Sequence, residues 1–177
     1  FVLTLFGSDR VLDINPHEPL PMLKNRHALL MPTYNETPSR VFARLQATFE
    51  SVAESGRLAH FDFFVLSDTT DPEIWIQEEA QYLGLVARSV SSQIFYRHRR
   101  DNTARKAGNI GEWVERFGGR YESMVILDAD SVMTGDAVVR HAAATEHNPS
   151  ARLLQTSQIL AHTHNALSRL TQFPGRP

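Results

Sequence analysis

Short apolar runs alternate along this chain with longer stretches whose apolar residues recur at helical spacing, and this alternation constrains the fold more than any other feature. Each run is too short for a helix and is bounded by polar or turn residues, so each predicts a buried strand. The runs are Ala28–Met31, Phe61–Leu66, Ile94–Tyr96, Met124–Leu127 and Leu153–Leu154. Strands that alternate with helices form parallel sheets joined by right-handed crossovers. We therefore predict one α/β domain with a Rossmann-like, mostly parallel sheet flanked by helices.

Four helices are expected around these strands. The first begins at Thr37-Pro38, an N-cap followed by a proline, and ends at Gly56. The second begins in the same way at Asp71-Pro72, the third ends at Gly118-Gly119, and the fourth covers about 136–147. The residues expected to face the sheet are Phe42, Leu45, Phe49 and Val52 in the first helix, Ile76, Ala80 and Leu83 in the second, and Ile110, Trp113, Val114 and Phe117 in the third.

The composition excludes several classes of protein. Of the 177 residues, 42% are hydrophobic and 21% are charged, which does not indicate a disordered chain. The formal net charge of −2 gives no general attraction to nucleic acid, and we expect no nucleic-acid partner. The absence of cysteine excludes disulfides, thiolate zinc sites and cysteine nucleophiles. No apolar run reaches the roughly 18 residues of a membrane-spanning helix.

The two ends of the chain predict a piece of a longer protein. Residues 1–26 are expected to form a connector, because prolines and other turn residues interrupt any periodicity there. Composition leaves open whether Phe1–Phe6 is an ordinary strand or the end of an upstream membrane helix. Residues 27–177 are expected to form the domain itself.

Polar and charged residues follow each of the first four predicted strands. They are Thr33, Tyr34, Asn35 and Glu36 after the first, Asp68 after the second, Arg97 to Arg100 and then Arg105, Lys106 and Asn109 after the third, and Asp128 and Asp130 after the fourth. Ligands of parallel sheets bind outside the carboxyl ends of the strands. The four loops are therefore expected to form one site.

The residue types in these loops suit a nucleotide-activated donor. Asp128 and Asp130, one residue apart at a strand end, can share Mg²⁺ or Mn²⁺ through oxygen ligands. Lys106 and the nearby arginines suit a diphosphate, and Asp68 is placed to accept hydrogen bonds from a ribose or a base. Neither a dinucleotide glycine fingerprint nor a Walker A loop occurs in the sequence.

Five motifs occur in order at successive strand ends. They are Met31–Glu36, Phe63–Asp68, Tyr96–Arg100, Arg105–Asn109 and Leu127–Ser131. Together they resemble the cytoplasmic catalytic domain of family 2 glycosyltransferases with the GT-A fold, the group that contains bacterial cellulose synthase. The likeness covers about residues 26–173, and five motifs in order are far more specific than any one of them.

The resemblance implies an inverting glucosyltransferase that uses UDP-glucose and a divalent cation, Mg²⁺ or Mn²⁺, to extend a growing glucan acceptor. The products would be β-glucan chains such as osmoregulated periplasmic glucans. The parent protein would span the bacterial inner membrane several times, with this domain on the cytoplasmic face. Matched by position, the donor would be bound by Thr33, Tyr34, Asn35, Glu36, Asp68, Arg105, Lys106, Asn109 and Asp128, and the metal by Asp128 and Asp130.

One part of the family's pattern is missing. Its general base is an aspartate in a Thr-Glu-Asp type motif, and its acceptor side carries a Gln-x-x-Arg-Trp motif, and neither occurs here. The resemblance therefore implies a GT-A domain truncated at its C-terminus, with the base beyond Pro177. Because nothing in the chain would deprotonate the acceptor, it should not turn over by itself.

Two other functions remain open from the sequence. In a phosphatase of the haloacid dehalogenase type, Asp128 would be the nucleophile and Asp130 the acid/base. Against this, three strand–helix units precede that strand, which normally opens such a domain. The third possibility is a non-catalytic nucleotide-binding module, held by an anionic partner through Arg97, Arg99 and Arg100.

Overall fold

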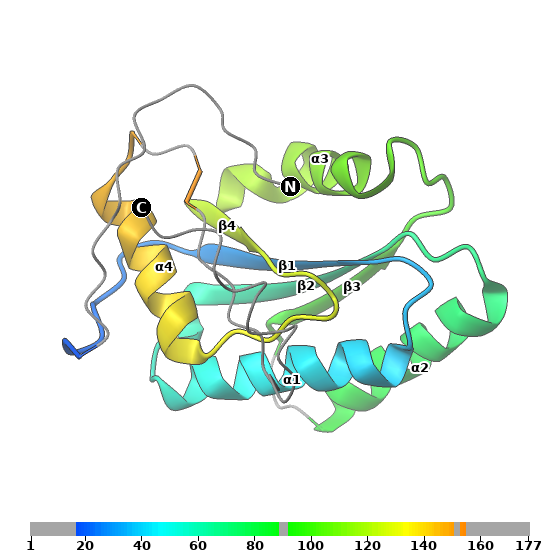
Figure 1. Ribbon diagram of the computed structural model, residues 1–177, viewed down its shortest axis with the longest axis horizontal. Coiled ribbons are helices and arrows are strands. Elements are labelled where there is room, and N and C mark those ends of the chain that lie inside the picture. The colour runs from blue at the N-terminus through cyan, green and yellow to red at the C-terminus, as the bar shows by residue number, and fades with distance from the viewer. Residues whose placement is uncertain (1–16, 89–91, 151–152, 155–177) are drawn as a thin grey trace, which may run out of the picture.

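The computed structural model describes residues 17–88, 92–150 and 153–154. Its sheet has the strand order β3-β2-β1-β4, and all neighbouring strands are parallel (Figure 1). The strands are β1 (His27–Thr33), β2 (Phe61–Ser67), β3 (Ile94–His98) and β4 (Ser123–Ile126). The α-helices are α1 (Pro38–Glu54), α2 (Pro72–Arg88), α3 (Arg105–Phe117) and α4 (Gly135–His147). The 3-10 turns η1 (Leu58–His60) and η2 (Gly118–Arg120) precede β2 and β4. The predicted α/β domain with a parallel sheet is confirmed.

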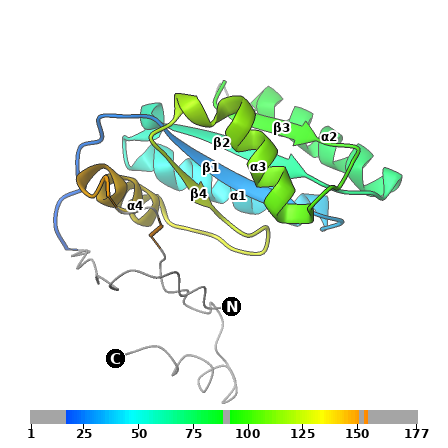
Figure 2. The same cartoon turned by 90° about the horizontal axis from the view of Figure 1, so that it is seen from above.

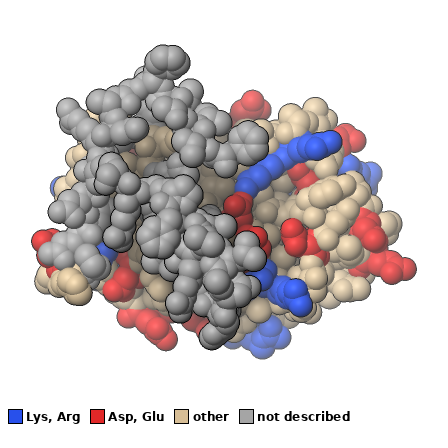
Figure 3. Space-filling model, in the orientation of Figure 1, with Lys and Arg blue, Asp and Glu red and all other residues tan. Residues whose placement is uncertain are grey.

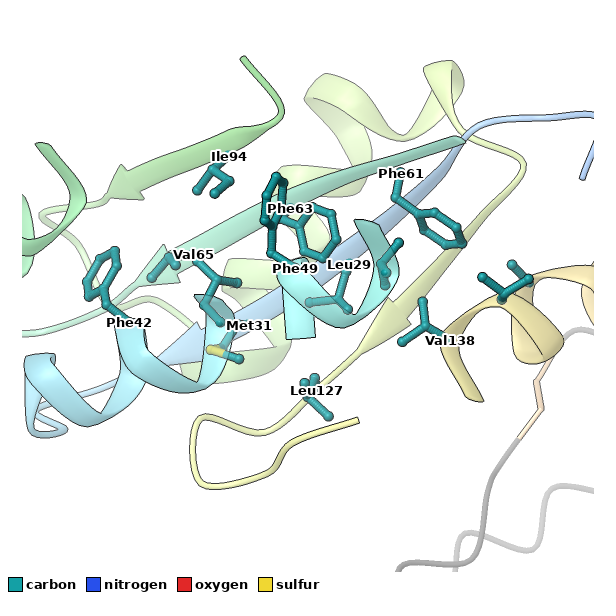
Figure 4. Close-up of a cluster of buried hydrophobic side chains, with 14 of the residues drawn as sticks. Leu29, Met31, Phe42, Phe49, Phe61, Phe63, Val65, Ile94, Leu127 and Val138 are labelled. Atoms are coloured by element: carbon teal, nitrogen blue, oxygen red, sulfur yellow. The ribbon is translucent and has the colours of Figure 1, made fainter. Parts of the chain in front are cut away.

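Helices cover both faces of the sheet, with α1, α2 and α4 on one face and α3 on the other (Figure 1, Figure 2). Successive side chains of a strand point to opposite faces, so a strand covered on both faces reads as a continuous apolar run. The larger core joins strand residues such as Leu29, Met31 and Phe63 to Phe42 and Phe49 of α1 (Figure 4). The smaller core, under α3, is made of Ala28, Leu30, Phe64, Leu66 and Trp113.

The inward face of α2 is not the predicted one. The predicted residues Ile76, Ala80 and Leu83 are all exposed, and Glu78 and Leu85 are buried instead. The prediction assumed that a carboxylate stays in water. Three hydroxyl groups beneath α2 donate hydrogen bonds to Glu78, and a buried polar group is tolerated when it is satisfied in this way.

The predicted fifth strand is also wrong. Leu153 and Leu154 have no regular structure, and Leu153 is 66% exposed. A run of two apolar residues is too short to bury a strand face, so its hydrophobicity alone is a weak signal. The other four predicted strands are present, with boundaries shifted by at most two residues.

The described part of the predicted connector, residues 17–26, holds no helix or strand. Phe1–Phe6, for which a membrane helix end was one interpretation, lies outside the described residues. Within the described ranges, none of the helices has the length and hydrophobicity needed to cross a bilayer.

The strand order reverses at β1, which has β2 and β3 on one side and β4 on the other. The connections on the two sides therefore cover opposite faces, and a crevice is left outside the carboxyl ends of β1 and β4. Crevices at such a reversal are where open α/β sheets bind ligands.

Candidate functional site

A pocket of about 670 Å³ lies at the carboxyl ends of β1, β2 and β4. It is lined by Pro32, Thr33, Tyr34, Glu36, Asp68, Asn102, Arg105, Lys106, Asn109, Asp128, Ala129 and Asp130. One pocket is thus lined by all the predicted donor-site residues except Asn35 and by both predicted metal ligands. In the view of Figure 3, acidic and basic side chains are interspersed over the part of the surface that the described residues form.

Asp68 lies in the pocket wall, directly after β2, and its side chain is only 4% exposed. Both of its carboxylate oxygens accept hydrogen bonds from Arg99, one of them from Nη2 at 3.0 Å. The same Nη2 also donates to the backbone oxygens of Thr103 and Arg105, at 3.0 and 2.9 Å. The hydrogen bond to Asp68 raises the pKa of Arg99. Each oxygen of Asp68 keeps a second lone pair, which a ligand can still use.

Asn109 belongs to the first turns of α3 and is 1% exposed. Its Nδ2 donates to the backbone oxygen of Leu66 at 3.0 Å, and its Oδ1 accepts from Arg97. Arg97 also donates to the backbone oxygen of Asn109 at 2.9 Å. Because these side-chain atoms are already paired, Asn109 fixes α3 against β2 at the pocket wall.

Asn35, the predicted donor residue that does not line the pocket, joins two of its loops. Its Oδ1 accepts from the backbone N–H groups of Thr70 and Asp71, at 3.1 and 3.2 Å. Its own backbone N–H donates to Oγ1 of Thr69 at 3.1 Å. Asn35 has a left-handed backbone with φ of 52°, which asparagine adopts more easily than most residues.

The Asp128-Ala129-Asp130 turn carries the two predicted metal ligands. Asp128 pairs with Lys106 through Oδ1, and the two side chains are 50% and 51% exposed. Asp130 is exposed and accepts from Ser131 Oγ at 3.2 Å. Arg44 of α1 fixes the turn from below, because its Nη1 donates to the backbone oxygen of Ala129 at 2.8 Å.

These two carboxylates fit a divalent cation. Mg²⁺ is often held by one or two carboxylates together with the substrate's phosphates and several waters. In the described part of the chain, no group of three or more acidic or histidine side chains is arranged so that it could hold a metal ion. Asp128 and Asp130 therefore suit a metal that is shared with a bound phosphate, rather than one enclosed entirely by protein ligands.

Two buried polar atoms at the pocket lack hydrogen-bond partners within the described residues, Thr33 Oγ1 and Asn102 Oδ1. Buried polar atoms in proteins are usually paired, so both are suited to contact a ligand. Thr33 was predicted from its place after the first predicted strand, and it is the last residue of β1. Asn102 was missed because it lies within an arginine-rich loop and belongs to no motif with a known spacing. Arg44 and Glu78 carried no sequence signal either, since each acts on a loop distant from it in the chain.

No family model matches the chain. Curated proteins do match it, and they are named glucans biosynthesis glucosyltransferase H. The protein of Xanthomonas oryzae pv. oryzae is 55% identical and that of Rhodopseudomonas palustris is 53% identical, each over 99% of this chain. The chain spans only 27% and 24% of the lengths of these two relatives. The resemblance to glucosyltransferases that the five motifs indicate is confirmed. Over nearly its whole length, the chain is a homologue of one segment of the proteins named glucans biosynthesis glucosyltransferase H.

Proposed function

We propose that the pocket binds UDP-glucose and that the chain forms the donor-binding part of an inverting glucosyltransferase that builds β-glucan chains, the osmoregulated periplasmic glucans. One observation carries the proposal. All the predicted donor residues but Asn35 line a single pocket at the reversal of the strand order, together with Asp128 and Asp130. The names of the relatives support a glucosyltransferase of glucan synthesis.

The uridine, the diphosphate and the metal each have counterparts among these residues. Asp68 and the Thr33–Glu36 loop would hold the uridine, while Lys106 and Arg105 would attract the diphosphate. Asp128 and Asp130 would hold Mg²⁺ or Mn²⁺, which would neutralise the negative charge that develops on the leaving diphosphate. Lys106 already pairs with Asp128, so a cation suited to phosphate lies beside the carboxylate suited to metal.

Transfer with inversion needs a group that takes the proton of the attacking acceptor hydroxyl. The acidic residues that line the pocket, Glu36, Asp68, Asp128 and Asp130, are assigned to the donor and the metal. No Thr-Glu-Asp motif occurs in the 177 residues. We therefore propose that the base belongs to another part of the parent protein and that this chain binds the donor without transferring glucose. The parent would lie in the inner membrane with this domain on its cytoplasmic side.

The phosphatase and the binding module predict different behaviour at the same pocket. A phosphatase would form a covalent adduct at Asp128 with a phosphate analogue. That function would leave the Thr33–Glu36 loop and Asp68 without a role. An unspecific anion-binding module would not distinguish UDP from ADP. The names of the relatives support neither of these two functions.

Calorimetric titration of UDP into the chain, with and without Mn²⁺, tests the proposal. We expect metal-dependent binding that weakens about tenfold or more in Asp130→Asn, and weaker binding of ADP. Asp136→Asn is the matched control, because Asp136 is an exposed aspartate in the first turn of α4, outside the pocket. If the chain has the circular dichroism of an α/β fold and still binds no UDP, the donor-site proposal is wrong.

A further inference from the structure

Glu78 is a fully buried carboxylate beneath the pocket. It lies in α2 with no exposed surface, and no cationic side chain among the described residues forms an ion pair with it. It accepts hydrogen bonds from Ser67 Oγ at 2.6 Å, from Thr69 Oγ1 at 2.8 Å and from Tyr96 Oη at 2.9 Å. Burying a charge is costly unless it is well hydrogen-bonded. The three hydroxyls provide that compensation, at the end of β2 where the pocket begins.

The carboxylate fixes the direction of the hydrogen bonds around it. Ser67 Oγ and Thr69 Oγ1 both donate to the Glu78 carboxylate, so their hydroxyl protons point at it. Their lone pairs are then available to backbone N–H groups. The N–H of Thr69 donates to Ser67 Oγ at 3.2 Å, and the N–H of Asn35 donates to Thr69 Oγ1 at 3.1 Å. Two short chains of hydrogen bonds thus lead from Glu78 to the backbone of two pocket loops, and such chains strengthen cooperatively.

These chains end at the residues assigned to uridine binding. Ser67 and Thr69 are the two sequence neighbours of Asp68, so Glu78 holds the backbone on both sides of it. Asn35 belongs to the loop Thr33–Glu36. Glu78 itself is not part of the pocket lining, so any effect on a ligand must pass through these neighbours.

We propose that Glu78 is a positioning residue of the donor pocket, which sets the places of Asp68 and the Thr33–Glu36 loop through the hydroxyls of Ser67 and Thr69. The inference rests on the proposed function, because the ligand whose binding it serves is the uridine diphosphate part of the donor. It also explains why α2 turns a glutamate toward the sheet while Ile76 and Leu83 face outward.

The test is UDP titration with Mn²⁺ on the full 177-residue chain at a temperature where circular dichroism shows it folded. Glu78→Gln keeps the size of the side chain, but its amide nitrogen cannot accept, so one or two of the three hydroxyls lose their acceptor. We expect UDP affinity to fall about tenfold. Glu79→Gln, the same change at the exposed neighbour on the same helix, should leave the affinity unchanged.

A second pair of variants tests the route through the hydroxyl and does not depend on the folding of Glu78→Gln. Thr69→Val removes the hydroxyl at nearly constant size and should weaken UDP binding, whereas Thr69→Ser keeps the hydroxyl and should retain the affinity. A merely structural role would lower the melting temperature without this pattern in affinity.

The outcomes separate the two proposals. If the folded wild-type chain binds no UDP, the proposed function is overturned and this inference falls with it. If the wild-type chain binds UDP and Glu78→Gln or Thr69→Val binds it equally well, only the positioning role is overturned.

Discussion

Two ion pairs lie in the pocket wall, and they differ in burial. The side chains of Asp68 and Arg99 are 4% and 9% exposed, whereas those of Asp128 and Lys106 are about half exposed. An exposed pair contributes roughly 0–1 kcal/mol, while removal of one partner from a buried pair costs about 3–5 kcal/mol. The Asp68–Arg99 pair therefore maintains the wall of the pocket. The Lys106–Asp128 pair can exchange partners at little cost when a charged ligand binds.

Arg99→Ala should lower the free energy of unfolding by about 3 kcal/mol, because it leaves the Asp68 carboxylate buried without a partner. It also frees two backbone oxygens of the loop before α3. Urea denaturation measures the change. Arg100→Ala is the matched control, since Arg100 is exposed, and should shift stability by less than about 0.5 kcal/mol. Equal stability of the two variants would contradict the assignment.

The residues of the pocket were largely predictable, but their individual contacts were not. Thr33, Asp68 and Asp128 follow strands, and the carboxyl ends of parallel strands meet at one edge. The burial of Glu78 was not predictable in this way, because its three hydroxyl donors come from β2, β3 and the loop after β2. Nor does the sequence reveal that the side chains of Asn35 and Asn109 are hydrogen-bonded to neighbouring segments of the chain, or that Asn35 does not line the pocket.

At the scale of an element, the start of α3 is unusual. Ala104 and Arg105 have left-handed backbones, with φ of 55° and 49°. Such conformations cost energy in residues other than glycine, and they are enriched at functional sites. Gly108 makes this start possible, because a Cβ there would lie 2.1 Å from the backbone oxygen of Thr103. The same oxygen of Thr103 accepts a hydrogen bond from Arg99, whose side chain also pairs with Asp68 in the pocket wall. The close contact between Gly108 and Thr103 therefore lies next to the pocket wall.

Two glycines of α3 should therefore respond in opposite ways to the same substitution. Gly108→Ala should destabilise the chain by about 2 kcal/mol, because the loop before α3 must move away. Gly111→Ala should stabilise it by about 0.5–1 kcal/mol, since a Cβ there meets nothing within 4 Å and alanine favours a helix. Thermal and urea unfolding of the two variants measure both signs. Stabilisation by both substitutions to the same degree would show that helix propensity, not the close approach, governs this region.

The positions of the elements were predictable because their signals are local. Thr37-Pro38 marks the start of α1, and the residues of this helix that were predicted to face the sheet are buried. The inward face of α2 and the fifth strand were mispredicted because each depends on a partner. A helix face is decided by what lies beneath it, and Leu153–Leu154 could form a strand only if another strand paired with it.

At the scale of the whole molecule, the end of the sheet opposite the pocket carries a second buried polar cluster. β1 has seven residues, so this end lies roughly 20 Å from the pocket. His27, which has no exposed surface, lies 2.8 Å from Ser123 Oγ through Nδ1 and 3.1 Å from Glu146 Oε1 through Nε2. Glu146 also accepts from the backbone N–H groups of Asn25 and Lys24. The hydrogen bonds of this cluster hold residues 24–25 and β1 against β4 and α4.

This cluster should make the chain less stable in mild acid. Burial lowers the pKa of His27 below its ordinary 6.5, although Glu146 opposes the shift. Burial alone would raise the pKa of Glu146, but hydrogen bonds from Asn25, Lys24 and His27 lower it below 4.5. Below pH 6.5 the unfolded chain therefore takes up a proton that folded His27 resists, and below pH 4.5 the same holds for Glu146. Stability should be complete above pH 6.5 and fall as the pH falls, by about 1.4 kcal/mol for each unit of lowered pKa.

Urea unfolding of the wild type and of His27→Gln between pH 7.5 and pH 5 checks this expectation. His60 and Glu122 also act on His27, but they remain in both proteins, so the difference between the two curves isolates the histidine. We expect His27→Gln to be less stable at pH 7.5 and to lose less stability toward pH 5. The matched control is His147→Gln at the exposed end of α4, which should keep the wild-type slope. If wild type and His27→Gln have parallel curves, His27 does not remain neutral in the folded chain, and the acid sensitivity must have another origin.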